Sequence, residues 1–397
     1  MAATTPRSDA PVQLVCMKPS LVITSIKKKA TQHLFRPLLW AEHAESTSNA
    51  SRNHSGSSHL TLWLLELLFF SATDEEDVTS SRFVSYVETE HELSIVMDEA
   101  MLPRFPEGTL AHEPSRWKAL QVASAGAGAF LTQLETLHEL TTLLANQHIS
   151  VFRVSTYQTD YILIKVEDLH RAVQCLESMC DVEMDEDEMA QFEMSRTVEI
   201  VCSEQTSPCG DQANQSSTQE LTISTPHMKL YVLQIDKACM KRHLYSLLRM
   251  FFNECRSPRT QSAPASSDQL FLSYSEAGGN ISIVTSDVEF LQSMRELADA
   301  GEVGIMVCPD AWKVVQVSDH DLGFTEADIV AAHTRVLLSA GTTMFFLSTY
   351  TTEYMLIKED EWSDAMETLQ EHLRFVDGHF VPLVQPATNV VKAPNKS

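Results

Sequence analysis

Two short segments concentrate the polar residues that could do chemistry. Residues 155–165 read STYQTDYILIK and residues 348–358 read STYTTEYMLIK. Each begins with a serine hydroxyl and carries one carboxylate at its turn, Asp160 in the first segment and Glu353 in the second. Interpreted from the pattern alone, both serines are strand-end hydroxyls without a catalytic role, and a simple turn residue is one of the alternatives for each acid.

No known catalytic or metal-binding motif accompanies these segments. The sequence contains no P-loop, no GxGxxG after a predicted strand, no GxSxG and no HExxH. Its 8 cysteines form no CxxC pair, and none lies at zinc-ligand spacing from a histidine. We therefore expect a non-enzymatic protein with no catalytic residues, no metal site and no cofactor.

Composition indicates an acidic protein with more than one hydrophobic core. The 397 residues exceed the usual size of a single core, and 44% of them are apolar. The net charge of −25 repels phosphate backbones and anionic lipids, so we expect neither nucleic-acid nor membrane binding. Neither a membrane-spanning run nor a signal-peptide pattern is present. The scattered cysteines are typical of reduced thiols, and we expect a cytoplasmic location.

The two segments belong to a longer internal repeat. Residues 116–122 (RWKALQV) match residues 311–317 (AWKVVQV), and residues 92–96 (ELSIV) match residues 280–284 (NISIV). All three matching blocks follow the same order along the chain, which predicts an internal duplication.

The elements inside each copy follow from local pattern. In the second copy we expect a strand at 312–317, a helix beginning at Thr325, a hairpin at 343–358, a helix at 361–373 and a strand at 375–381. This βαββαβ order is that of the ferredoxin-like motif. The first copy repeats the order with a strand at 117–122, a helix at 133–146, a hairpin at 149–165 and a helix at 167–179.

Each half also has room for one preceding unit of the same kind. We therefore predict an α+β fold of four tandem ferredoxin-like βαββαβ units arranged as two repeated pairs. The predicted boundaries are 15–112 for unit 1, with a polar insertion at about 41–58, 113–202 for unit 2, 228–305 for unit 3 and 306–385 for unit 4. Residues 203–227, rich in Ser, Thr, Gln and Pro, are predicted to be a linker.

The repeats and their hairpins resemble the CASTOR family, cytosolic arginine sensors of the TOR pathway built from four ACT domains. The most specific matching residues are Ser150-Val151, STYQTD at 155–160, and Leu322-Gly323-Phe324. The resemblance covers roughly residues 15–185 and 228–380.

The resemblance implies an amino acid ligand, with arginine first, held between units 2 and 4. The positions matching the family's ligand site are Ile149, Ser150, Val151, Leu322, Gly323, Phe324, Thr325, Glu326, Ala327, Asp328, Thr349, Tyr350 and Glu353. A helix N-terminus after Gly323 suits a carboxylate, and a buried acid such as Glu353 suits a cationic side chain.

Three of these positions depart from the family pattern. Glu353 replaces an Asp, and Ala327 and Asp328 replace a Cys and a Gly. Asp328 also fits a capping-box residue, and Glu353 also fits a simple turn residue. The sequence thus leaves the ligand open among arginine, lysine, another amino acid and none.

The turn formed by Tyr157, Gln158, Thr159 and Asp160 matches the family's partner-binding turn completely. The resemblance therefore implies a GATOR-type partner complex. Tyr157 and Tyr350 fit equally well as residues that pack between units. In the family the first and third units pair into a homodimer, and the sequence leaves open whether this chain does the same.

A sensor or adaptor is the preferred function because the repeats account for every long segment. Two alternatives remain at this point. One is an allosteric ACT regulatory protein of amino-acid metabolism, and the other is an ACT scaffold that binds no ligand.

Overall fold

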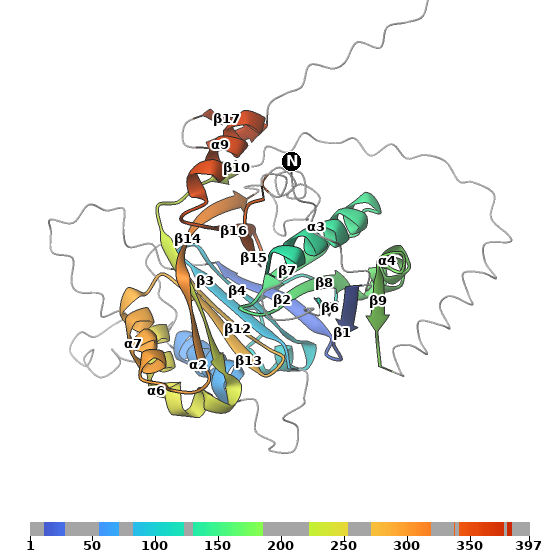
Figure 1. The fold of residues 1–397 in the computed structure, drawn as a ribbon. Coiled ribbons are helices and arrows are strands. Elements are labelled where there is room, and N and C mark those ends of the chain that lie inside the picture. Colours follow the sequence, from blue (N-terminus) through green and yellow to red (C-terminus); the bar gives the residue numbers. More distant parts are fainter. Residues whose placement is uncertain are drawn as a thin grey trace, which may run out of the picture.

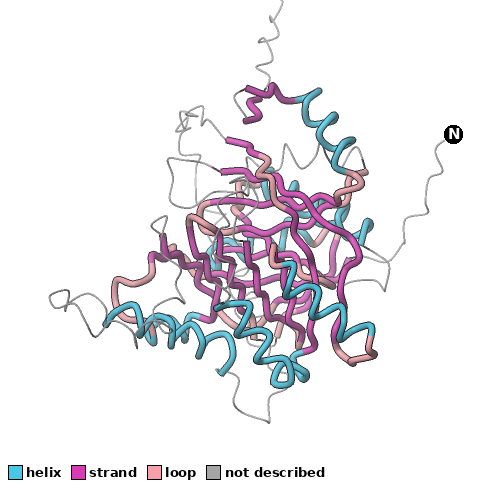
Figure 2. Tube along the Cα trace, turned by 90° about the vertical axis from the view of Figure 1, so that its left-hand side faces the viewer, coloured by secondary structure: helices cyan, strands magenta, loops and turns pink. Residues whose placement is uncertain are grey.

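The computed structural model describes residues 12–27, 55–70, 82–122, 130–185, 222–252, 271–318, 337, 341–376 and 379–382. Within these ranges, strands form the centre of the molecule and helices lie at its periphery (Figures 1 and 2). None of the described helices is long and apolar enough to cross a membrane.

The segments predicted as units 1 and 3 share one antiparallel sheet. Its middle is the pairing of β3 with β12, which sets Tyr86 opposite Tyr274. From one edge to the other the strands are β2 (Leu21–Lys27), β4 (Glu92–Asp98), β3 (Val84–Thr89), β12 (Phe271–Ala277), β13 (Asn280–Thr285) and β11 (Lys229–Asp236). The segments predicted as units 1 and 3 are therefore joined edge to edge within one chain.

The segments predicted as units 2 and 4 form a second sheet in the same way. Its middle is the contact of β7 with β15, where Val154 pairs with Leu347. The strands run in the order β9 (Cys180–Glu183), β1 (Val12–Cys16), β6 (Trp117–Val122), β8 (Asp160–Lys165), β7 (Val151–Ser155), β15 (Met344–Ser348), β16 (Thr352–Lys358), β14 (Ile305–Ser318), β10 (Thr222–Ser224), β18 (His379–Pro382) and β17 (Leu373–Val376). Two strands of this sheet come from other predicted ranges: β10 lies near the end of the predicted linker, and β1 lies at the start of the segment predicted as unit 1.

The two sheets close on each other into one barrel-like ring. On one side β14 pairs first with β11 and then with β16. On the other side β2 meets β6 at Leu21 and Trp117. The short strand β5 (Ala111–His112) pairs with β2 next to this corner. The sequence predicts separate ferredoxin-like units, whereas the structure makes their strands continuous. The division into four units itself stays a prediction.

Helices cover the outer face of each sheet. On the first sheet lie α2 (Ser55–Leu65) with the following π-helical turn η1 (Glu66–Phe70), α6 (Met240–Phe252) and α7 (Val288–Asp299). On the second sheet lie α3 (Phe130–Asn146), α4 (Leu169–Leu176) and α9 (Trp362–His372). Short helical turns at η2 (Glu99–Arg104), η3 (Val166–Asp168) and η4 (Lys237–Cys239) link strands to the following segments.

Because each sheet has helices on one face and the other sheet on the opposite face, its central strands are buried on both faces. Every residue of β3, β12 and β15 is buried. Only β15 is mainly apolar, whereas β3 and β12 bury polar side chains as well, and Ser85 and Ser275 hydrogen-bond to each other at 3.1 Å across their pairing. Between the sheets, Trp117 and Trp312 are buried in two apolar clusters, as predicted for core residues.

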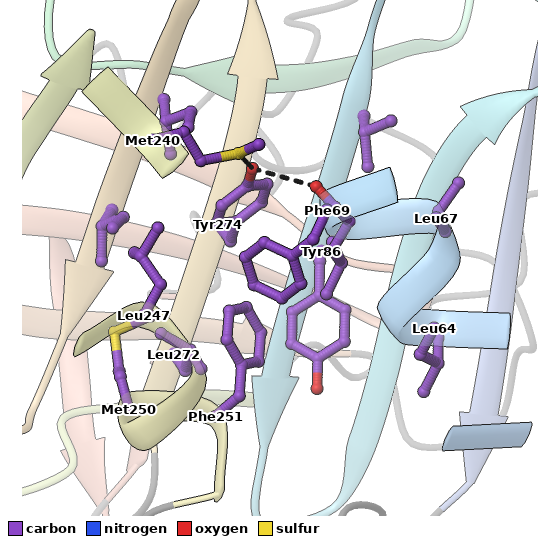
Figure 3. Packing of buried hydrophobic residues seen from close by; sticks show 14 of the residues in the cluster. Leu64, Leu67, Phe69, Tyr86, Met240, Leu247, Met250, Phe251, Leu272 and Tyr274 are labelled. Atoms are coloured by element: carbon purple, nitrogen blue, oxygen red, sulfur yellow. Dashed lines mark hydrogen bonds between the residues drawn. The ribbon is translucent and has the colours of Figure 1, made fainter. Parts of the chain in front are cut away.

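The outer core of the first sheet is built around aromatic rings from distant segments (Figure 3). Phe251 of α6 lies 5.5 Å from Phe69 and 5.3 Å from Tyr86 between ring centroids, both edge to face. Tyr274 donates a hydrogen bond of 3.3 Å to the carbonyl of Leu68. These contacts fix α2 and η1 on the sheet, although α2 begins inside the range predicted as a polar insertion.

The predicted elements of the two repeats are largely confirmed. The strand predicted at 117–122 is β6, and both predicted hairpins are present as β7–β8 and β15–β16. The helices predicted at 133–146, 167–179 and 361–373 are α3, α4 and α9 with shifted ends. The single strand predicted at 375–381 is wrong, because this segment forms two paired strands, β17 and β18. The helix predicted to begin at Thr325 lies outside the described residues.

Candidate functional site

The hairpins β7–β8 and β15–β16 meet through reciprocal hydrogen bonds. Near the Val154–Leu347 pair, the backbone N–H of Arg153 donates to Ser348 Oγ at 3.0 Å. The backbone N–H of Phe346 donates to Ser155 Oγ at 3.1 Å. Both serines therefore act as strand-joining acceptors at what we call the junction, the meeting of β7 and β15.

A buried ion pair spans this junction. The guanidinium of Arg153 from β7 contacts the carboxylate of Glu353 from β16, and their side chains are only 4% and 6% exposed. The guanidinium also lies over the ring of Phe346, 4.1 Å from its centroid. Burial raises the pKa of Glu353, and the Arg153 charge and hydrogen bond oppose that rise.

A second carboxylate belongs to the same group. Asp160 on β8 accepts a hydrogen bond from the Ser155 hydroxyl. Burial raises the pKa of Asp160 from 3.8 to about 6, although the Ser155 hydrogen bond and the Arg153 charge oppose the rise. Arg153, Ser155, Asp160, Ser348 and Glu353 together form what we call the junction cluster. It places one cation between two acids.

Only one of the described ligand-site predictions lies in the junction cluster. Glu353 is there, and its carboxylate already has a partner within the chain. Ile149 and Val151 pack in the core beneath α3 and α4, and Ser150 is half-buried. The predicted role of these three residues in ligand binding stays a prediction.

Two further predicted ligand residues contact unit 1 instead. The Thr349 hydroxyl donates to the Glu92 carboxylate. The backbone N–H of Tyr350 donates to Ser94 Oγ at 3.0 Å. Both partners lie on β4, so Thr349 and Tyr350 link the second repeated hairpin to the first sheet.

The remaining predicted ligand residues belong to one loop and the start of the following helix. All of them lie outside the described residues: Leu322, Gly323, Phe324, Thr325, Glu326, Ala327 and Asp328. Their predicted contribution to the site stays a prediction.

The predicted partner-binding turn lies against unit 3. The backbone N–H of Tyr157 donates to Ser282 Oγ at 2.9 Å, which matches its predicted alternative as a residue packed between units. Gln158 is exposed, and Thr159 is half-buried. Gln158 and Thr159 line a polar pocket of about 180 Å³ together with Gln234 and Asn280.

A larger pocket lies beside α9, away from the junction. It has a volume of about 450 Å³ and is lined by residues that include Met228, Lys229, Glu359 and Trp362. Lys229 and Glu359 form an ion pair of 2.7 Å at its wall. Among the residues that the structure describes, no group of His, Cys, Asp or Glu is arranged to hold a metal ion.

Arg153 is the site residue that sequence reasoning missed. It stands alone in an apolar strand, between Phe152 and Val154. A single charge at such a position is rarely buried without a partner, and this signal could have identified it. The corresponding residue in the second copy is Phe346.

Comparison with known proteins defines the relatives of this chain. The ACT domain family model matches residues 113–178 and 307–371. A second model, described as cytosolic arginine sensor for mTORC1 subunit 1/2, ACT-like, matches residues 50–113. The similarity to the CASTOR family is confirmed. The two repeats that meet at the junction are thus ACT domains.

The curated relatives are similar over most of their length. Cytosolic arginine sensor for mTORC1 subunit 1 is 25% identical in Pongo abelii and 24% identical in Homo sapiens, in each case over 315 residues. Each alignment covers 77% of this chain and 90% of the relative. The human putative protein CASTOR3P is 34% identical over 105 residues, which is 25% of this chain and 64% of that protein.

The solved structures that match are too distant to support an argument about the fold. A protein from Agobacterium tumefaciens has 18% identity and a TM-score of 0.27, with 44% of this chain and 95% of that chain covered. Aspartate kinase from Synechocystis has 9% identity and a TM-score of 0.28, with 90% of this chain and 55% of that chain covered.

Proposed function

We propose that the protein is a non-enzymatic amino acid sensor or adaptor that acts in the cytoplasm on TOR signalling. The observation that carries this proposal is the junction itself. Two ACT domains meet there edge to edge, and a buried carboxylate lies between them. Relatives covering most of the chain are named as arginine sensors, which supports the same class of function.

The ligand site we propose lies on the helix-facing side of the junction. A bound amino acid would place its carboxylate at the helix start expected near residues 323–328. Its side chain would extend toward the junction cluster. Arginine is the first ligand to test because the relatives are named for it, but any cationic side chain has to compete with Arg153 for Glu353.

The partner we propose is a GATOR-type complex that binds the turn from Tyr157 to Asp160. Gln158 is the exposed member of that turn and is available to a partner. A homodimer would need a surface other than the β3 and β12 edges, because these two strands pair with each other.

A thermal-shift screen of the full chain against the twenty amino acids tests the sensor proposal. A ligand that binds only the folded state at 100 times its dissociation constant adds about 2.7 kcal/mol of stability. At least one amino acid should therefore raise the melting temperature. If none does, the sensor proposal is wrong.

A scaffold without a ligand is the second candidate function. The Arg153–Glu353 pair favours it because the buried carboxylate is neutralised within the chain. In that case the screen gives no shift, while the protein still co-purifies with its partner complex.

A further inference from the structure

The repeat makes the junction cluster nearly two-fold symmetric. Ser155 pairs with Asp160 in the first hairpin, and Ser348 pairs with Glu353 in the second. The two acids therefore occupy corresponding positions and lie on the same face of the sheet. The symmetry breaks at one place, where the first copy has Arg153 and the second has Phe346.

We propose that Arg153 fills, from within the chain, the place against Glu353 that the cationic group of a ligand would occupy. The junction is then complete without a free cation. The protein as it exists does not bind arginine there, and any ligand it senses has no cationic side chain. This inference rests on the ligand site proposed above and states which side chains that site excludes.

The position of Arg153 is held at three points. Its backbone N–H is bound to Ser348, its guanidinium contacts Glu353, and the same guanidinium lies over Phe346. A tethered group acts at an effective concentration that a free ligand has to exceed. Binding of free arginine to Glu353 would also displace the Arg153 guanidinium. That guanidinium would then be buried without its carboxylate partner, which is unfavourable.

The pairing is incomplete on the side of the arginine. The Nε–H of Arg153 is buried and has no hydrogen-bond partner in the part of the chain that the structure describes. Glu353 therefore receives one contact from Arg153, through Nη2, where a guanidinium placed freely could bind it with two parallel hydrogen bonds. Removal of the Arg153 head group leaves an acidic space between Glu353 and Phe346 that matches one guanidinium.

The test is calorimetric titration of the full chain with arginine and with citrulline, which has nearly the same shape but no charge. The wild type should bind neither. Arg153→Met keeps much of the aliphatic volume and removes the charge, so it should bind arginine with a dissociation constant at least about tenfold below the highest arginine concentration at which the wild type shows no binding. It should not bind citrulline, and adding Glu353→Gln should abolish the gain.

Lys237→Met provides a control at another buried acid. Lys237 pairs with the buried carboxylate of Glu276, away from the junction, and Arg82 contacts the same carboxylate at 3.4 Å. Its removal should not create arginine binding. A gain in this variant equal to that of Arg153→Met would overturn the inference. Loss of a cationic partner from any buried carboxylate would then be enough to create arginine binding.

The remaining outcomes are also decisive. Arginine binding by the wild type that Glu353→Gln abolishes overturns the inference and keeps the sensor proposal. A folded Arg153→Met variant that binds no arginine overturns the inference, while the amino acid screen of the wild type judges the sensor proposal independently. If Arg153→Met does not fold alone, arginine but not citrulline should restore its folded circular-dichroism spectrum, and failure to do so counts against the inference.

Discussion

The two repeated hairpins have the same backbone geometry. The N–H of Thr156 donates to the carbonyl of Thr159 at 2.8 Å, and that of Thr349 donates to the carbonyl of Thr352 at 2.7 Å. In each hairpin the following tyrosine N–H donates to a serine of the first sheet, Ser282 or Ser94. The duplication has therefore preserved the main-chain contacts between the sheets.

The side chains around the two turns have diverged. Glu92 fills the space beside the second turn and accepts hydrogen bonds from Thr349 and Ser25. Asn280 holds the corresponding position beside the first turn, where a pocket of about 180 Å³ remains. The comparison teaches that the repeat determines the backbone architecture of both turns. Single polar residues then determine whether the space beside a turn is filled by a side chain or remains a pocket.

The largest expected difference between the hairpins concerns their two acids. Glu353→Gln leaves Arg153 buried without its carboxylate, so we expect the free energy of unfolding to fall by about 3 kcal/mol. At pH 4, where Asp160 is protonated in the fold, Asp160→Asn should cost about 1 kcal/mol because it loses mainly one hydrogen bond from Ser155. Urea unfolding measures both values. Equal losses would show that the ion pair does not distinguish the copies.

The second expected effect is a pH dependence of the free energy of unfolding that arises from the first hairpin. The pKa of Asp160 is raised to about 6 in the folded state, so the fold favours its protonated form. Its contribution to stability is therefore present below about pH 4 and is lost as the pH rises through 6. Relative to Asp160→Asn, the wild type should lose on the order of 1–3 kcal/mol between pH 4 and 7.

Unfolding of both proteins at a series of pH values checks this dependence. The charged groups facing Asp160 are Arg153 from β7 and, across the junction, Glu353 from β16. If the difference between wild type and Asp160→Asn is flat over this range, Asp160 is ionised in the fold without penalty.

The third effect concerns the residues beside the turns. Glu92→Ala removes an acceptor that is 3% exposed and leaves the Thr349 and Ser25 hydroxyls with fewer partners. We expect it to lower the free energy of unfolding by about 1–2 kcal/mol. Asn280→Ala loses the 3.0 Å bond from Gln234 beside an existing pocket and should cost less than about 1 kcal/mol. Thermal unfolding of the two variants compares them directly, and a larger loss for Asn280→Ala would reverse the comparison.

The order of elements could be predicted from the sequence because the repeat identified matching blocks. The hairpins β7–β8 and β15–β16 follow from apolar runs broken by a polar turn. Edge pairing between units could not be predicted in this way. The β3–β12 contact joins residues far apart in sequence, and the polar residues of β3, such as Ser85, do not indicate in the sequence that they are buried against β12.

The site was harder to predict than the fold. The resemblance predicts Glu353 as a ligand residue, which stays a prediction, but it carries no information on Arg153, because a residue inside an apolar strand is normally a packing residue. Thr349 and Tyr350 belong to the same turn as Glu353 but face the first sheet. Which sheet these two residues contact depends on how the two sheets pack against each other. A motif within one strand does not specify that packing.

The smallest expected effect on stability tests the function proposed for the first turn. Gln158→Ala removes an exposed side chain, and its matched control Thr351→Ala changes the corresponding residue of the second turn. Both should change the free energy of unfolding by less than about 0.5 kcal/mol. Only Gln158→Ala should reduce co-purification with a GATOR-type complex, because only the first turn keeps the partner-binding pattern. If Gln158→Ala still binds the partner while the fold is intact, the first turn is a packing element like the second turn. The pocket beside the first turn is then a consequence of the Asn280 side chain and not a partner-binding site.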